Sequence, residues 1–205
     1  MRRGFGFERA VLAVAALAVM AGSADALLVS LDRADIRRAL DLAQWPRTDQ
    51  DRARFHARYL VRVGSAAVGQ TSVDTIETIT EFRRMVIVAE EHARLNDMFA
   101  RGGRIQEAEE ALRAYRGRLS IVAHLRFGPH VAGVPDIDLA FADPDAPRAI
   151  DLRRAPIYAL DGTLIGADIE AVFTSASIGQ TTHTVAVRLR DAELARAAID
   201  FKDLD

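Results

Sequence analysis

The spacing of apolar residues changes at Gly117, and this change limits what the chain can fold into. Before Gly117, apolar side chains recur every three to four residues, which is typical of helices with one buried face. After it they alternate with polar residues, which indicates strands that bury one side of a sheet. The sequence therefore predicts an α+β protein, with a helical section over residues 27–117 followed by an antiparallel β-sandwich over residues 118–205.

The longest predicted helix runs from Thr71 to Gly103 and is expected to be the core of the helical section. Thr71 and Asp74 offer side-chain oxygens for the free amides of a first turn, and the Gly102-Gly103 pair suits a C-terminal cap. The buried face of this helix is expected to comprise Thr75, Ile79, Phe82, Val86, Ala89, Ala93 and Ala100.

Shorter helices are predicted over residues 33–44, over about ten residues from Thr48, and over residues 104–116. The section thus holds three to four helices. Because only the glycine pair separates the long helix from the last one, these two are expected to form an antiparallel αα-hairpin.

The β-sandwich is expected to be immunoglobulin-like, with roughly six or seven strands. Alternating apolar residues mark the segments 118–127, 137–141, 150–152, 157–160, 165–173, 185–189 and 199–201. Asp161-Gly162, between two of these segments, is typical of a tight β-hairpin.

The first 26 residues have the pattern of a cleaved signal peptide. Arg2, Arg3 and Arg9 flank an apolar run over residues 10–20, and Ala24-Asp25-Ala26 matches a small-residue cleavage site. The alternative is a membrane anchor, but a spanning helix needs about 20 apolar residues. We therefore expect export to the periplasm or the extracellular space and no membrane span in the mature chain. The general and the twin-arginine export routes both stay open.

Composition excludes several classes of site. The chain contains no cysteine, which rules out disulfides, lipid-modified cysteine anchors, thiolate metal sites and cysteine nucleophiles. Its formal charge of −2 provides no strong field for nucleic acid. With 50% hydrophobic residues, the chain has enough apolar material for a globular core without disulfides.

The chain carries no sequence motif of a serine nucleophile, a phosphate-binding glycine loop or a zinc protease. Its histidines are His56, His92, His124, His130 and His183. Around His92, the residues Glu81, Glu90 and Glu91 all miss the i,i+3 or i,i+4 spacing that two ligands on one helix need. His124 is expected on the polar face of its strand.

Four aspartates gather at one predicted strand and the turn after it. Asp136 and Asp138 point to the same face of the strand, and Asp143 and Asp145 flank a proline. Because carboxylate oxygens are the ligands that calcium prefers, these residues are a candidate Ca²⁺ site. The alternative is a solvent-facing strand followed by an ordinary turn.

Three aromatic residues, Trp45, Phe55 and Tyr59, lie close together in the first part of the chain. They are expected either to pack in the core or to form a patch that faces a partner.

These observations favour an exported, non-enzymatic binding or interaction protein whose partner is another protein or a component of the cell envelope. The alternative is a secreted hydrolase or metal-dependent enzyme with its site at the seam between helices and sandwich. That alternative requires His92, His124, His130 or His183 to meet carboxylates in the fold.

Overall fold

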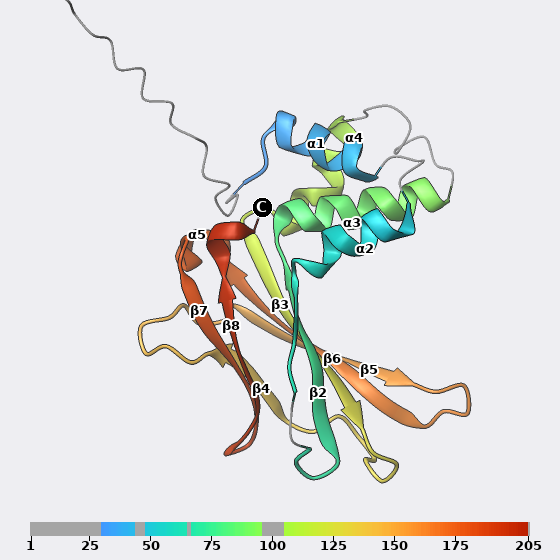
Figure 1. The fold of residues 1–205 in the computed structure, drawn as a ribbon, viewed down its shortest axis with the longest axis vertical. Coiled ribbons are helices and arrows are strands. Elements are labelled where there is room, and N and C mark those ends of the chain that lie inside the picture. The colour runs from blue at the N-terminus through green and yellow to red at the C-terminus, as the bar shows by residue number, and fades with distance from the viewer. Residues whose placement is uncertain (1–29, 44–47, 65–66, 96–104, 205) are drawn as a thin grey trace, which may run out of the picture.

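The computed structural model describes residues 30–43, 48–64, 67–95 and 105–204. The predicted signal peptide lies outside these residues, as do Trp45 and the end of the predicted long helix. The described chain forms two antiparallel sheets with a layer of helices at one end (Figure 1). The prediction of an α+β protein is confirmed.

The helical layer contains α1 (Arg33–Ala43), α2 (Asp49–Ala57), α3 (Glu81–Arg94) and α4 (Ile105–Leu112), which continues into a 3₁₀ turn, η1 (Arg113–Tyr115). The predicted starts of α1, α2 and α4 are correct to within about two residues. α1 packs on α3, and α4 contacts both of them. The segment that would close the predicted αα-hairpin of α3 and α4, residues 96–104, lies outside the described residues.

The predicted helix from Thr71 is wrong in its first part. Residues Thr71–Ile79 form a strand, β2, and helix α3 begins only at Glu81. Thr80 is the N-cap, because its backbone is extended and its hydroxyl accepts a hydrogen bond from the amide of Arg83 at 3.1 Å. Thr71 and Asp74 therefore belong to a sheet and not to a helix cap.

The composition of β2 explains the error. Six of its nine residues are β-branched, which favours a pleated strand over a helix. Its buried face includes Thr71 and Thr78. Because these buried positions hold polar residues, the sequence does not show the alternation of apolar and polar residues that predicts a strand. The register also shifts between Val73 and Thr75, which interrupts the alternation.

The larger sheet has the strand order β1-β2-β3-β6-β5, and all its neighbours are antiparallel. Its remaining strands are β1 (Leu60–Arg62), β3 (Arg118–Phe127), β5 (Asp151–Tyr158) and β6 (Leu164–Thr174). β2 and β3 pair along eight residues, so the sheet takes strands from both sides of the predicted boundary at 117/118. The predicted segments 150–152 and 157–160 are parts of the single strand β5.

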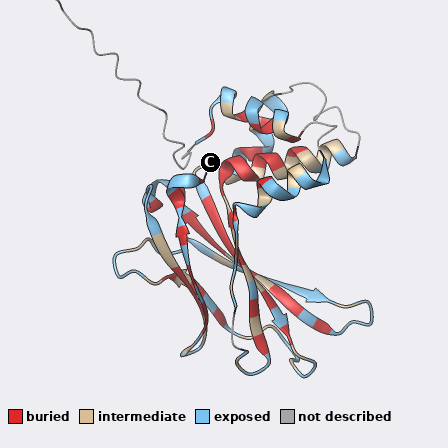
Figure 2. Ribbon diagram, in the orientation of Figure 1, coloured by how far each residue is buried: buried red, intermediate tan, exposed pale blue. Residues whose placement is uncertain are grey.

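The smaller sheet has the order β4-β7-β8, with β4 (Ile137–Phe141), β7 (Thr182–Leu189) and β8 (Ala192–Asp200). A short helix, α5 (Ser175–Ile178), leads into β7, and a 3₁₀ turn, η2 (Phe201–Asp203), follows β8. The two sheets share one core: Phe141 of β4 lies 4.6 Å from Phe173 of β6 between ring centroids, and Phe201 lies 6.2 Å from Phe141. Buried residues run along the strands of both sheets (Figure 2).

The arrangement leaves the outer face of the five-stranded sheet only partly covered. Alternate residues of β3 and β6 face the core, including Ile121, Ala123, Ile169 and Ala171. The residues between them point outward, and the helices lie over one end of the sheet only (Figure 1). The outer face next to the helices is where the polar side chains of the sheet come together.

Candidate functional site

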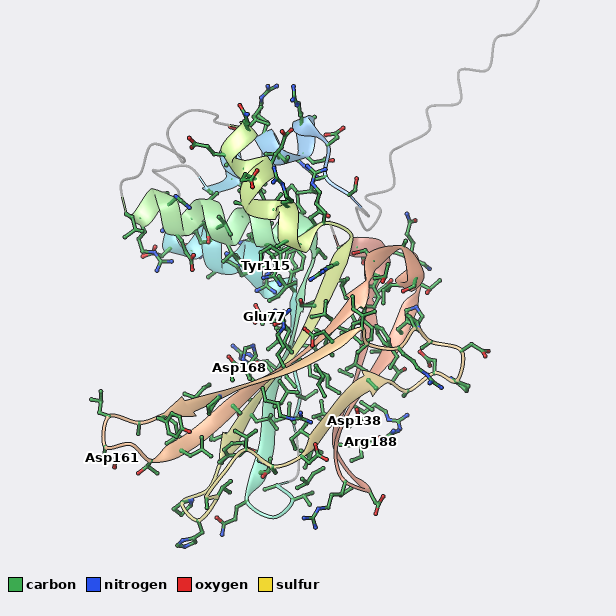
Figure 3. All side chains as sticks on the ribbon, turned by 180° about the vertical axis from the view of Figure 1, so that it is seen from behind. Glu77, Tyr115, Asp138, Asp161, Asp168 and Arg188 are labelled. Atoms are coloured by element: carbon green, nitrogen blue, oxygen red, sulfur yellow. The ribbon has the colours of Figure 1, made fainter. Side chains whose placement is uncertain are left out.

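A row of three side chains crosses the outer face of the larger sheet. His124 of β3 stands between Glu77 of β2 and Asp168 of β6. Its Nδ1 lies 2.7 Å from Asp168 Oδ1, and its Nε2 lies 2.8 Å from Glu77 Oε2. His124 and Asp168 are directly opposite in the strand register, whereas Glu77 is diagonal to His124. Figure 3 labels Tyr115, Glu77 and Asp168, which follow one another from the helical layer down the sheet.

The partners of His124 determine its charge. Since an ionised carboxylate only accepts hydrogen bonds, both contacts are satisfied together when both ring nitrogens carry hydrogen, that is, when the ring is an imidazolium. The hydrogen bond to Glu77 raises the pKa of His124 above 6.5; partial burial opposes this effect, and Asp168 adds to it. Burial alone would raise the pKa of Glu77, but the hydrogen bonds and charges of His124 and Arg83 outweigh it and hold that pKa below 4.5.

A second set of contacts joins this row to the helices. The other carboxylate oxygen of Glu77 accepts from Arg83 of α3, whose side chain is only 3% exposed. Arg83 also donates to the backbone oxygen of Thr78, and its guanidinium carbon lies 4.8 Å from the ring centroid of Tyr59. Its Nε donates to Nδ1 of His56 in α2 at 3.5 Å.

His56 continues the contacts into α3. Because its Nδ1 accepts from Arg83, its Nε2 carries the hydrogen and donates to Glu90 Oε2 at 2.9 Å. A polar network of six side chains thus spans β6, β3, β2, α2 and α3. Its members, in order, are Asp168, His124, Glu77, Arg83, His56 and Glu90.

Arg84 anchors the helical layer at a neighbouring point. It donates to Ser120 Oγ of β3 at 3.1 Å and to Glu170 of β6 at 3.4 Å, and it lies over the ring of Tyr115 at 4.2 Å. Arg153 of β5 lies 3.8 Å from the other oxygen of Glu170. Glu170 is therefore shared by an arginine of the helical layer and an arginine of the edge strand.

The geometry limits what His124 can do chemically. A general base needs a ring nitrogen that is free to take a proton from the reacting group. Both nitrogens of His124 are occupied by carboxylates. Within the described part of the chain, no group of three or more His, Asp or Glu side chains is placed where it could hold a metal ion. In this arrangement His124 pairs two carboxylates, and it could act as a general base only after releasing one of them.

A second surface lies at the far end of the same strands. We call residues 157–165, the end of the β5–β6 hairpin, the hairpin tip. Among the described residues, most of the exposed large apolar side chains lie there: Ile157, Tyr158, Leu160 and Ile165. Tyr158 is 60% exposed and Leu160 is fully exposed. Apolar side chains gathered in this way on a protein surface mark a candidate interaction surface.

The hairpin tip extends past strand β3 and is joined to the core through Leu164, which is buried. The last pair between β3 and β6 is Arg126 with Gly166, so residues 157–165 extend past their neighbouring strand. The amide of Ala159 donates to the oxygen of Thr163 at 2.8 Å, and that of Gly162 donates to Ala159 at 3.0 Å. The carboxylate of Asp161 accepts from the amide of Thr163 at 2.9 Å. The predicted Asp161-Gly162 hairpin is confirmed.

The four aspartates of the candidate calcium site have different neighbours. Asp136 accepts from Arg154 at 2.7 Å. Asp143 accepts from the amide of Thr184 at 3.2 Å. Asp138 and Asp143 line one shallow hollow of about 400 Å³. Asp138 and Asp145 are both exposed. Calcium binding stays a prediction.

Of the aromatic residues considered for partner binding, Phe55 and Tyr59 lie in the core, with their ring centroids 5.4 Å apart. Phe55 also lies 6.4 Å from Phe82 of α3. These contacts correspond to the packing alternative. Trp45 lies outside the described residues.

The histidines meet different partners. His124 contacts two carboxylates, while His56 contacts Glu90 and His183 contacts Asp143 at 3.3 Å. Neither Glu77 nor Asp168 is among the site residues predicted from the sequence. Glu77 falls near the start of the predicted long helix, where the structure has strand β2. The sequence signal that was available for both is a charged residue within a strand.

Among the described residues, no helix is both long and apolar enough to cross a membrane. No protein-family model matches the chain, and comparisons with known proteins and with solved structures find no significant match.

Proposed function

We propose that this chain is an exported, non-enzymatic interaction protein that binds a partner protein through the hairpin tip, residues 157–165. The observation that supports the proposal is the gathering of Ile157, Tyr158, Leu160 and Ile165 on one protruding hairpin. Exposed apolar side chains interact unfavourably with water, and a partner that covers them removes that cost. Fully burying one leucine is worth about 1.5–3 kcal/mol.

The tip suits a binding role because it needs little reordering. Its turn is fixed by backbone hydrogen bonds and by the side chain of Asp161, and Pro156 restricts the strand beside it. A segment already held in its bound shape loses less conformational entropy on association. Tyr158 and Leu160 would serve as the central anchors, because a few large side chains carry most of the energy of an interface.

The charge at the tip indicates the chemistry of the partner. Hydrogen bonds from Thr163 lower the pKa of Asp161, so its carboxylate stays ionised next to Leu160. Moving this charge into lipid would be costly. The fitting partner is a protein with an apolar groove and a cationic side chain at its rim.

Two further parts of the proposal, export and an immunoglobulin-like sandwich, rest on sequence patterns and on comparison with other β-sandwiches. Export rests on the basic, apolar and small-residue segments of residues 1–26. An immunoglobulin-like form of the sandwich rests on strand spacing, and sandwiches often recognise partners through loops and hairpins.

The test is a binding experiment with the chain attached to a solid support. Envelope and extracellular fractions are passed over the wild type, over a Tyr158→Ser/Leu160→Ser variant, and over Leu95→Ser, which changes an exposed leucine on the helical layer. We expect a protein that is retained by the wild type and by Leu95→Ser but lost from the hairpin variant. Equal retention by all three chains would contradict the proposal.

One observation favours the enzyme alternative. His124 is 32% exposed and meets two carboxylates at the seam where α3 reaches the sheet. If a hydrolase site lies at this seam, the purified protein should cleave an ester, peptide or glycoside substrate. The His124→Gln variant should then have lost that activity. Wild-type protein without such activity would leave the interaction function as the better account.

A further inference from the structure

We propose that the polar network from Asp168 to Glu90 is a proton-operated clamp: protonated His124 holds α2 and α3 on the five-stranded sheet, and loss of its proton loosens them. This inference is independent of the hairpin tip and of any partner.

The sheet end of the clamp is the imidazolium ring of His124. The ring lies between Glu77 and Asp168 and donates one hydrogen bond to each. When the ring loses a proton, one nitrogen becomes an acceptor and faces a carboxylate that is also an acceptor. One of the two hydrogen bonds must then break, and the two carboxylates repel each other across a neutral ring.

The helix end of the clamp depends on the position of Glu77. Its second oxygen holds Arg83, which is buried and reaches the backbone of Thr78, the ring of Tyr59 and Nδ1 of His56. A shift of Glu77 away from His124 therefore disturbs a buried cation. Such a cation is costly to leave without its counterion.

The groups around His124 do not replace its charge. Three cations on or beside this face have carboxylate partners outside the row: Arg84 with Glu170, Arg126 with Asp74, and Arg153 with Asp151 and Glu170. Arg83 belongs to the clamp, while Arg62 of β1, opposite Thr75 in the register, and Arg118 at the start of β3 are exposed to solvent. On the packed helices, His56 contacts Arg83 and Glu90, Tyr115 contacts Arg84, and Glu81 accepts from the amides of Leu31 and Gly117. When His124 is neutral, Asp168 therefore loses its positive partner.

The direction of the pH effect follows from the two shifted groups. The pKa of His124 is raised, so its contribution to stability is fully present below pH 6.5 and is lost as the pH rises through the pKa in the folded protein. The pKa of Glu77 is lowered, so its contribution is present above pH 4.5 and is lost as the pH falls through its folded value. The clamp is strongest between pH 4.5 and 6.5 and loosens on the alkaline side.

The experiment measures urea unfolding of the purified chain between pH 6 and pH 9. For the wild type, we expect the unfolding equilibrium constant to rise with pH. Each unit by which the folded pKa of His124 exceeds the unfolded one corresponds to a tenfold rise. His124→Gln keeps an amide that can donate to one carboxylate but does not titrate, so the rise should disappear. His130→Gln changes an exposed loop histidine and should keep the wild-type rise.

Hydrogen exchange on the wild type tests the clamp without any substitution, and so covers the case in which His124→Gln does not fold. After correction for the intrinsic exchange rate, amides of α2 and α3 should lose protection between pH 6 and pH 9. Amides of β7 and β8 should lose less, because no member of the network touches that sheet. An unchanged pH rise in folded His124→Gln, or equal loss of protection in both regions, would overturn the proposal.

Discussion

Strand β6 takes part in two surfaces of opposite character. Near the helices, Asp168 belongs to a half-buried network in which each charge has a partner. At its other end, the strand passes Gly166 and enters the hairpin tip, where Ile157, Tyr158, Leu160 and Ile165 are exposed and Leu164 is buried. At the seam, paired charges join the helices to the sheet. At the tip, exposed apolar side chains are expected to add little to the free energy of unfolding, and we propose that they bind a partner.

The strongest test of this contrast is Arg83→Met. The substitution leaves Glu77 without its buried cation and removes the donor to the oxygen of Thr78. Removing one member of a buried ion pair typically lowers the free energy of unfolding by about 3–5 kcal/mol. Urea denaturation at pH 6 measures the loss.

Arg126→Met is the matched control. Arg126 pairs with Asp74 at 2.6 Å, but its side chain is 71% exposed. Exposed pairs contribute about 0–1 kcal/mol, so this variant should unfold nearly as the wild type does. If both arginine variants lost the same free energy of unfolding, the buried pair of Arg83 and Glu77 would stabilise the protein no more than the exposed pair of Arg126 and Asp74.

The next test lies at the boundary between the two surfaces. A Cβ atom at Gly166 would stand 2.3 Å from the backbone oxygen of Leu125, so Gly166→Ala must push β6 away from β3. Crowding of this kind costs about 1–3 kcal/mol in the free energy of unfolding. Gly133→Ala, where a Cβ would meet nothing within 4 Å, should leave the thermal midpoint unchanged. A stable Gly166→Ala would mean that the hairpin can move independently of β3.

A smaller effect is expected from Asp168→Asn. Asp168 is the more exposed of the two carboxylates on His124, so solvent weakens its contribution. The expected loss at pH 6 is about 1 kcal/mol or less. A titration of the ring signals by NMR should also show a lower pKa for His124, because a negative partner that favours the charged ring has been removed. An unchanged pKa would mean that Glu77 alone sets the charge of the ring.

The sequence revealed those elements whose signals are local. The helix over 33–43, the strand over 118–127 and the Asp161-Gly162 hairpin follow from periodicity and turn chemistry within a few residues. Strand β2 was missed because threonines fill part of its buried face. Its β-branched composition indicates a strand, and Thr80 marks the start of the helix that follows.

The polar network could not be read from the sequence in the same way. Glu77 and His124 are 47 residues apart, and His124 and Asp168 are 44 residues apart. These side chains come together only if β2, β3 and β6 are neighbours in the right register. The sequence has no local turn signal that determines the strand order or the register. The exposure of Ile165 has a similar cause. It shares the alternation of the buried residues of β6 but lies beyond the last pair with β3.

The smallest expected effect on stability belongs to Leu160→Ser, which tests the other half of the contrast. Leu160 is fully exposed in the folded chain, so the free energy of unfolding should change by no more than about 0.5 kcal/mol. Retention on a hydrophobic-interaction column should nevertheless fall, because the side chain belongs to the largest gathering of exposed apolar residues in the described chain. Leu95→Ser removes an exposed leucine of the helical layer, outside the hairpin tip, and should reduce retention less. If Leu160→Ser destabilised the fold by more than about 1 kcal/mol, the tip would be packed in solution, and its role as a free binding surface would have to be abandoned.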